Sequence, residues 1–230
     1  MIDLNFSDFG KKLCGPSGIN ALMDDLGKPL PKGIPVSLMG GGNPARIPEV
    51  EAMYRSQMQK IFSNGDDFEN LIGKYDSPQG KTAFLSQVAD CLSSRYGWKI
   101  GPENIAVTNG SQSAFFYLFN MFRGRFSDNG STKIKKIVFP LVPEYVGYAD
   151  QGIEQGTFTG INAGFEKFED RTFKYHIDFE HLENYLSATD DTAAICVTRP
   201  TNPTGNVLTD KEIHRLSDIA QKYSIPLFID

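Results

Sequence analysis

The stretch AAICVTRPTNPTG, residues 193–205, decides the fold. Its first six residues, 193–198, form a short and almost wholly apolar run, which predicts a strand buried on both faces. The prolines and the glycine that follow predict a tight loop. Thr209 then opens a helical pattern, Glu212 completes a capping box three residues later, and residues 225–230 form the next apolar run. A strand, a helix and a strand joined by short loops predict a right-handed βαβ unit, and therefore an α/β fold with a mostly parallel sheet.

The alternation of strands and helices extends upstream. Short apolar runs predict further strands over residues 105–108, 137–139 and 158–162. Apolar residues at helical spacing predict helices over residues 17–26, 47–62, 79–96, 112–122, 145–150 and 179–187. The polar and basic segment 123–136 predicts a solvated loop.

Composition restricts the class of protein. The chain has 230 residues, 40% of them hydrophobic, and a net charge of −5, which indicates a globular protein and argues against nucleic acid or an anionic membrane as its main partner. The first thirty residues hold no long apolar run, so we expect no secretory signal and a cytoplasmic location. Cys14, Cys91 and Cys196 lack the spacing of metal ligands, so we expect no metal site and three buried thiols.

Residues 108–113, Thr-Asn-Gly-Ser-Gln-Ser, join a predicted strand to a predicted helix. Backbone N–H groups at the start of a helix, together with the helix dipole, suit a phosphate group, and the Ser111 hydroxyl can add a hydrogen bond. The alternative is an ordinary turn in which glycine and serine serve only as turn and cap residues. The spacing matches neither a P-loop nor the dinucleotide-binding fingerprint.

Three more candidates follow predicted strands. Asn202 is either part of a β-turn or an amide that points into a crevice, and Tyr145 is either a core residue or a ring that stacks on a planar ligand. Asp230 is either an exposed strand end or a carboxylate paired with a cationic ring nitrogen or a metal. Because the carboxyl ends of parallel strands meet at one edge of a sheet, these groups together suit a flat, phosphorylated, heteroaromatic cofactor such as pyridoxal phosphate.

Six stretches carry a resemblance to a known family. They are LMGGGNPARIP (38–48), KYDSPQGKT (74–82), TNGSQSAFFYLF (108–119), FPLVPEYVGYAD (139–150), FKYHIDFEHL (173–182) and CVTRPTNPTGNVLT (196–209). In this order they resemble the fold-type-I pyridoxal-phosphate aminotransferases of class I/II. The GGGNPA, SQSAFFYLF and PEYVGYAD stretches resemble the bacterial valine–pyruvate type within that family. The resemblance implies an aspartate aminotransferase-like fold with three αβα layers, here truncated.

The resemblance also implies how pyridoxal phosphate is bound. Gly110, Ser111 and Gln112 would hold the phosphate through their backbone and side chains. Tyr145 would stack on the pyridine ring, and Asn202 would donate a hydrogen bond to the ring hydroxyl oxygen.

Further implied roles concern the ring nitrogen, the substrate and the assembly. Asp230 would pair with the protonated ring nitrogen, Gly42 would let the substrate carboxylate approach the backbone, and Tyr75 would reach the phosphate of a neighbouring subunit in a homodimer. The domain division implied is residues 1–45 as an N-terminal arm and part of a small domain, and residues 46–230 as an incomplete large cofactor-binding domain.

The activity implied is transfer of an amino group between L-valine and pyruvate, giving 3-methyl-2-oxobutanoate and L-alanine. The family's Schiff-base lysine lies beyond the strand that ends at Asp230, so we expect the chain to be the front part of a longer protein, with no catalytic lysine and no activity alone. The alternatives are another class I/II aminotransferase, of the aromatic or 2-aminoadipate type, and a non-catalytic truncated relative that acts as a binding module.

Overall fold

The protein is described by a computed structural model over residues 5–30, 32–35, 37, 45–128 and 130–230. The chain forms two compact units. The first unit comprises residues 1–27 and 109–230, and the second comprises residues 28–108. Among the described residues, no helix is long and apolar enough to cross a membrane.

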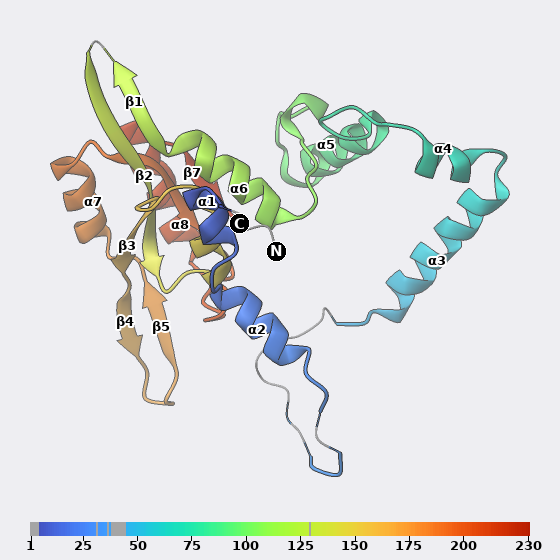
Figure 1. Ribbon diagram of the computed structural model, residues 1–230, viewed down its shortest axis with the longest axis horizontal. Helices are drawn as coiled ribbons and strands as arrows, with labels where there is room; N and C mark the ends of the chain where they lie inside the picture. The colour runs from blue at the N-terminus through green and yellow to red at the C-terminus, as the bar shows by residue number, and fades with distance from the viewer. Residues whose placement is uncertain (1–4, 31, 36, 38–44, 129) are drawn as a thin grey trace. The chain divides into compact units, whose positions relative to one another are not determined.

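A five-stranded sheet forms the centre of the first unit (Figure 1). Its strands are β1 (Gly124–Asp128), β2 (Ser131–Val142), β3 (Phe158–Asn162), β6 (Thr192–Val197) and β7 (Leu227–Ile229). The path runs β1-β2-β6-β7, and β3 also pairs with β2. The β2–β3, β2–β6 and β6–β7 pairs are parallel, and only the β1–β2 pair is antiparallel. The mostly parallel sheet expected from the sequence is therefore confirmed.

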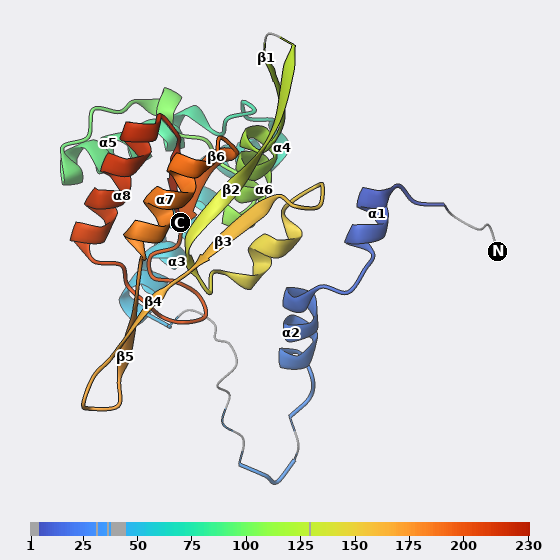
Figure 2. The same cartoon turned by 90° about the vertical axis from the view of Figure 1, so that its left-hand side faces the viewer.

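Helices cover both faces of this sheet, so the unit has three layers (Figure 2). The elements involved are α6 (Ser111–Phe122) and the 3₁₀ turn η2 (Val146–Asp150) on one face, and α7 (Phe179–Ala188) and α8 (Asp210–Tyr223) on the other. Side chains of β6 alternate between the two faces: Ile195 and Val197 pack with α7 and α8, whereas Ala194 and Cys196 pack with α6. Because both faces are buried, the strand reads as a continuous apolar run.

An aromatic cluster joins α6 to the sheet. Phe119 is fully buried, and its ring centroid lies 5.2–6.0 Å from those of Phe115, Phe139, Tyr148 and Phe158 (5.3, 6.0, 5.3 and 5.2 Å). Several of these pairs are tilted or edge-to-face, the arrangements that aromatic rings prefer. The cluster fixes Tyr148 beneath the carboxyl edge of the sheet.

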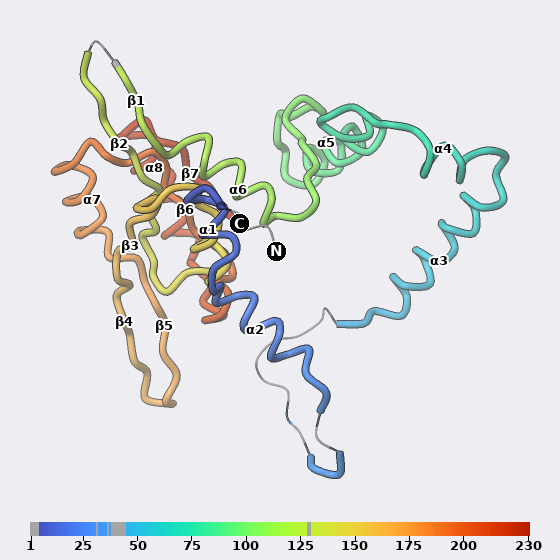
Figure 3. Tube along the Cα trace, in the orientation of Figure 1, coloured from blue at the N-terminus to red at the C-terminus, as the bar shows by residue number. Residues whose placement is uncertain are grey.

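The expectation of a loop over residues 123–136 is wrong, because β1 and the first half of β2 form a hairpin there (Figure 3). Its side chains are mostly exposed on both faces, so the strand has no apolar alternation to reveal it. The Asn129-Gly130 dipeptide of the sequence was the available signal, since it favours two-residue hairpin turns. A second hairpin, β4 (Gly164–Lys167) with β5 (Phe173–His176), was also missed.

The second unit is helical and contains α3 (Pro48–Ser63), α4 (Asp67–Gly73), α5 (Thr82–Tyr96) and the 3₁₀ turn η1 (Pro102–Asn104). The expected strand over residues 105–108 is wrong. Within this unit no described strand lies beside it, and the Val107 N–H instead donates to the Gln79 carbonyl at 2.9 Å. The Gln79 side chain donates to the carbonyls of Pro102 and Ile105, which closes this irregular segment.

Two helices of the N-terminal arm belong to the first unit: α1 (Asp8–Leu13) and α2 (Gly18–Leu26). The Ser17 side chain caps α2 and also donates to Asp150 Oδ2 at 2.5 Å, which ties the arm to the end of η2. The expectation of three buried cysteines holds only for Cys196, because Cys14 and Cys91 are exposed.

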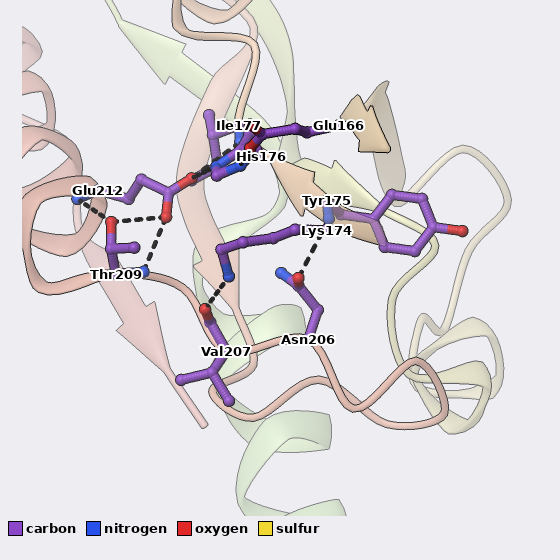
Figure 4. A network of polar contacts seen from close by, with 9 residues as sticks. All are labelled: Glu166, Lys174, Tyr175, His176, Ile177, Asn206, Val207, Thr209 and Glu212. Carbon is purple, nitrogen blue, oxygen red and sulfur yellow. Dashed lines mark hydrogen bonds and ion pairs between the residues drawn. The ribbon is translucent and has the colours of Figure 1, made fainter. Parts of the chain in front are cut away.

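The predicted capping box at the start of α8 is present and belongs to a larger network (Figure 4). Glu212 is 8% exposed, and its Oε2 accepts from the Thr209 N–H and hydroxyl, each at 2.7 Å. Its Oε1 accepts from the Ile177 N–H and lies 3.1 Å from His176 Nδ1. His176 Nε2 in turn lies 2.9 Å from Glu166 on β4, so one carboxylate connects α8 to the second hairpin.

Glu212→Gln is expected to destabilise the protein in a pH-dependent way. Burial would raise the pKa of the Glu212 carboxyl, but hydrogen bonds from Thr209, His176 and Ile177 outweigh burial and lower the pKa below its ordinary value near 4.5. The stabilisation is therefore present above pH 4.5 and is lost as the pH falls through the lowered pKa of the folded state. We expect a loss of about 2 kcal/mol in the free energy of unfolding at pH 7.

Urea unfolding at pH 7 and at pH 3 measures this difference. The gap between wild type and Glu212→Gln should narrow at the lower pH, because the wild type loses the same interactions. Glu180→Gln, an exposed substitution on α7, is the matched control and should lie within experimental error of wild type. A gap that is equal at both pH values would contradict an ionised network.

Candidate functional site

Polar groups gather at the carboxyl ends of β2, β6 and β7. Glu144 and Tyr145 follow β2, Thr198 follows β6, and Asp230 follows β7. The three strands are parallel neighbours, so their ends lie at the same edge of the sheet. This is the edge at which α/β sheets bind ligands.

Tyr148 connects two of these strand ends. Its hydroxyl donates to Asp230 Oδ2 at 2.5 Å and lies 3.2 Å from Thr198 Oγ1. Its ring is 3% exposed, stacks on Phe139 with a 5.6 Å centroid distance and meets the Tyr145 ring edge-on at 5.3 Å. The buried ring therefore fixes the direction in which one oxygen of the Asp230 carboxylate is held, while the carboxylate itself stays exposed.

The environment of the Tyr148 hydroxyl keeps it protonated, so it acts as a hydrogen-bond donor at neutral pH. Burial, and then the hydrogen bond to Asp230, raise the pKa of the Tyr148 hydroxyl far above its ordinary value of 10. Burial also raises the pKa of Cys196, so this thiol is protonated and unreactive at neutral pH. The Tyr148 hydroxyl therefore remains a hydrogen-bond donor to the Asp230 carboxylate at neutral pH.

Glu144 anchors the turn that follows β2. Its Oε1 accepts from the Thr198 N–H at 3.1 Å, and its Oε2 accepts from the Tyr145 N–H at 3.2 Å. The ring of Tyr145 lies against Gly147, where a Cβ atom would come within 2.4 Å of the ring. A side chain at position 147 would therefore push the Tyr145 ring out of its place.

The N-terminus of α6 joins the same region. Gly110, with φ of +103°, precedes the helix. The Gln112 side chain donates to the Gly147 carbonyl at 3.4 Å, which links the start of α6 to η2. Ser111 is exposed at the first position of the helix. Backbone donors and the positive end of the helix dipole thus lie beside the Tyr145 turn.

The loop that carries Asn202 is held from within. The Thr201 hydroxyl donates to the Thr198 carbonyl at 2.9 Å, and the Thr201 N–H donates to the Asn206 carbonyl at 2.8 Å. The Asn202 side chain itself is exposed. The peptide bonds before Pro143, Pro200 and Pro203 are cis.

The structure brings together some of the residues expected from the sequence. Gln112, Tyr145 and Asp230 are linked through η2, and Asn202 lies on the loop after the neighbouring strand. Tyr75 is fully exposed in the second unit, and Gly42 lies outside the described residues.

Three residues of the site were not among the sequence candidates: Glu144, Tyr148 and Thr198. Tyr148 follows Tyr145 by one turn of a 3₁₀ helix, and this spacing was the signal that places both rings on one side. Thr198 ends the buried strand at the ligand-binding edge. No sequence pattern indicates the role of Glu144, because its partners are backbone N–H groups, which every residue except proline carries.

The arrangement suits an organic cofactor. Among the described residues, no group of three His, Cys, Asp or Glu side chains lies close enough to hold a metal ion. A carboxylate that accepts from a buried tyrosine, an aromatic ring and a helix N-terminus instead match a cation, a planar ring and a phosphate on one molecule.

Known proteins are similar to this chain in sequence and in fold. The chain is 47% identical over 229 residues to the valine–pyruvate aminotransferase of Escherichia coli K12. This alignment covers 99% of this chain and 52% of that relative. The chain thus spans about half the length of this curated relative.

Two solved structures resemble the chain. A putative amino-acid aminotransferase from Psychrobacter arcticum 273-4 superposes with a TM-score of 0.87 and 43% identity, over 99% of this chain and 54% of that one. The valine–pyruvate aminotransferase AvtA of Salmonella typhimurium LT2 superposes with a TM-score of 0.73 and 44% identity, over 93% and 49%. The expected aminotransferase fold is therefore confirmed.

The sequence profile of one family, described as aminotransferase class I and II, matches residues 69–230. This match includes the α6 N-terminus, the turn with Tyr145 and Tyr148, and the strand end at Asp230. The chain belongs to the aminotransferase class I and II family.

Proposed function

We propose that the natural protein carrying this chain is a pyridoxal-phosphate-dependent aminotransferase that exchanges an amino group between L-valine and pyruvate. The cofactor of its family is pyridoxal phosphate. The observation that carries the proposal is the Asp230 carboxylate, held by Tyr148 at the ligand-binding edge of the sheet. The choice of L-valine and pyruvate is supported by the two relatives that are named for these substrates.

Asp230 is the residue that would hold the pyridine nitrogen. When bound, the cofactor supplies a protonated ring that accepts electrons from the substrate Cα. An ionised carboxylate next to a ring nitrogen raises the pKa of that nitrogen and keeps a proton on it. The Tyr148 hydroxyl, which cannot lose its own proton at neutral pH, donates to Asp230 and fixes the direction of one carboxylate oxygen.

The remaining cofactor contacts are proposed from their positions. Gly110, Ser111 and Gln112 would bind the phosphate at the start of α6. Tyr145 would stack on the pyridine ring, since Gly147 leaves its ring room at the edge of η2. Asn202 would donate to the ring hydroxyl oxygen from the loop after β6.

Further roles belong to the complete protein. We propose that Tyr75 reaches the phosphate of a neighbouring subunit in a homodimer, and that Gly42 lies against the substrate carboxylate. Residues 46–230 would then be part of a large cofactor-binding domain, preceded by an arm and a piece of a small domain in residues 1–45. We also propose a cytoplasmic location for this protein.

The natural protein should hold pyridoxal phosphate through a covalent bond that borohydride can reduce. Borohydride reduction followed by intact-mass measurement should show a pyridoxyl adduct on a protein well above 25.5 kDa. With L-valine and pyruvate as substrates, chromatography should then detect L-alanine and 3-methyl-2-oxobutanoate. A clear preference for an aromatic donor or for 2-aminoadipate would replace the substrate assignment, and an unmodified protein of 25.5 kDa would favour a binding module without catalysis.

Asp230→Asn should weaken cofactor binding and activity together. The amide keeps the shape of the side chain but carries no charge to hold a proton on the ring nitrogen. We expect a loss of roughly 10- to 100-fold in cofactor affinity and of about 100-fold or more in the transamination rate. Equilibrium dialysis and a coupled assay measure both quantities. Asp218→Asn, an exposed substitution on α8, is the control for the loss of one charge and should match wild type in both measurements.

Tyr148→Phe should weaken cofactor binding with little change in packing. The ring contacts remain, and only the hydroxyl that contacts Asp230 and Thr198 is lost, so we expect affinity to fall by about fivefold. Tyr185→Phe removes a comparable hydroxyl, which donates to Asp191 at 2.8 Å on the far face of the sheet. Equal cofactor affinity for the two variants would contradict the role given to Tyr148.

A further inference from the structure

The Glu144 carboxylate occupies an unusual position for an acidic side chain. It is half-buried at the end of β2 and turns toward the protein. Two backbone N–H groups from different elements point at it: Thr198 after β6 and Tyr145 at the start of η2. One side chain thus fastens the end of β2 to the end of β6.

The same hydrogen bonds lead to the proposed cofactor contacts. The Thr198 N–H donates to Glu144, while its hydroxyl lies 3.2 Å from the Tyr148 hydroxyl that donates to Asp230. On its other side Glu144 accepts from the backbone of Tyr145, the proposed stacking ring. Glu144 therefore contacts the supports of both the ring nitrogen site and the stacking site.

We propose that Glu144 is a positioning residue of the cofactor site, which holds the Tyr145 ring and the Tyr148–Asp230 pair in a fixed relation. This inference rests on the function proposed above. In this role Glu144 acts through Thr198 and Tyr145, whose N–H groups donate to it.

The need for two acceptors explains why the residue is acidic. A carboxylate offers one oxygen to each N–H group, whereas a glutamine would turn its own NH₂ toward one of the two donors. The acid is retained against an electrostatic cost. Burial raises the pKa of Glu144 above its ordinary value, the Thr198 hydroxyl and the two N–H groups oppose the rise, and the charge of Asp230 adds to it. A side chain selected for stability alone would avoid a second acid here.

Glu144→Gln in the natural protein tests the proposal. We expect cofactor affinity to fall by about tenfold, because one of two hydrogen bonds to a charged group is lost. The visible circular dichroism signal, divided by the amount of bound cofactor, should also decrease. The reason is that a loosely held Tyr145 ring no longer fixes the orientation of the pyridine ring. The melting temperature of the cofactor-free variant should fall by only a few degrees, as expected for one lost hydrogen bond. Glu169→Gln, an exposed substitution at the tip of the second hairpin, removes the same charge and should match wild type in all three measurements.

The outcomes separate this inference from the proposed function. If wild type binds pyridoxal phosphate but Glu144→Gln matches it in affinity and in circular dichroism, the positioning role is overturned while the proposed function stands. If Glu144→Gln loses affinity only in proportion to a large loss of melting temperature, Glu144 is a structural residue and the inference is again overturned. If wild type binds no pyridoxal phosphate, the proposed function and this inference fail together.

Discussion

Parallel pairing of β2, β6 and β7 is the constraint on which the site depends. Parallel strands place all their carboxyl ends at one edge, and here three such ends contribute Glu144, Thr198 and Asp230. Burial of both sheet faces fixes the register, because a shift of one residue would exchange Ile195 and Val197 with Ala194 and Cys196. The positions of the polar groups are therefore set by apolar packing several residues away.

Polar groups at this edge are stabilised by one another. Glu144 receives two backbone N–H donors, and Asp230 receives the Tyr148 hydroxyl, so each carboxylate has a hydrogen-bond partner before any ligand arrives. The aromatic cluster around Phe119 holds Tyr148 rigidly from below. A site organised in this way loses little entropy on binding a planar ring, because its groups are already ordered.

The sequence predicted the parts of the fold that rest on local patterns. The buried strand over β6, the capping box of α8 and the helix at Ser111 follow from apolar spacing and capping residues. The β1–β2 hairpin has no such pattern, because its side chains are exposed on both faces. The apolar run at 105–108 predicts a strand, but a strand also needs a neighbouring strand to pair with, and no described strand of its unit lies beside it. In the site, Asp230 and Tyr145 could be predicted because they follow recognisable strands. For Tyr148 the sequence offers only its spacing from Tyr145, since its hydrogen bond to Asp230 forms after folding. Glu144 could not be predicted, because its role depends on backbone contacts that arise only after folding.

Gly147 has a consequence for how this site can change. Its missing side chain is the space that the Tyr145 ring fills, so the two positions share one volume. A larger residue at 147 and a smaller one at 145 would compensate each other, whereas either change alone leaves a clash or a void. Substitutions at these positions are therefore expected to be strongly non-additive. The sizes of the two side chains are therefore coupled, which restricts the variation open to this turn.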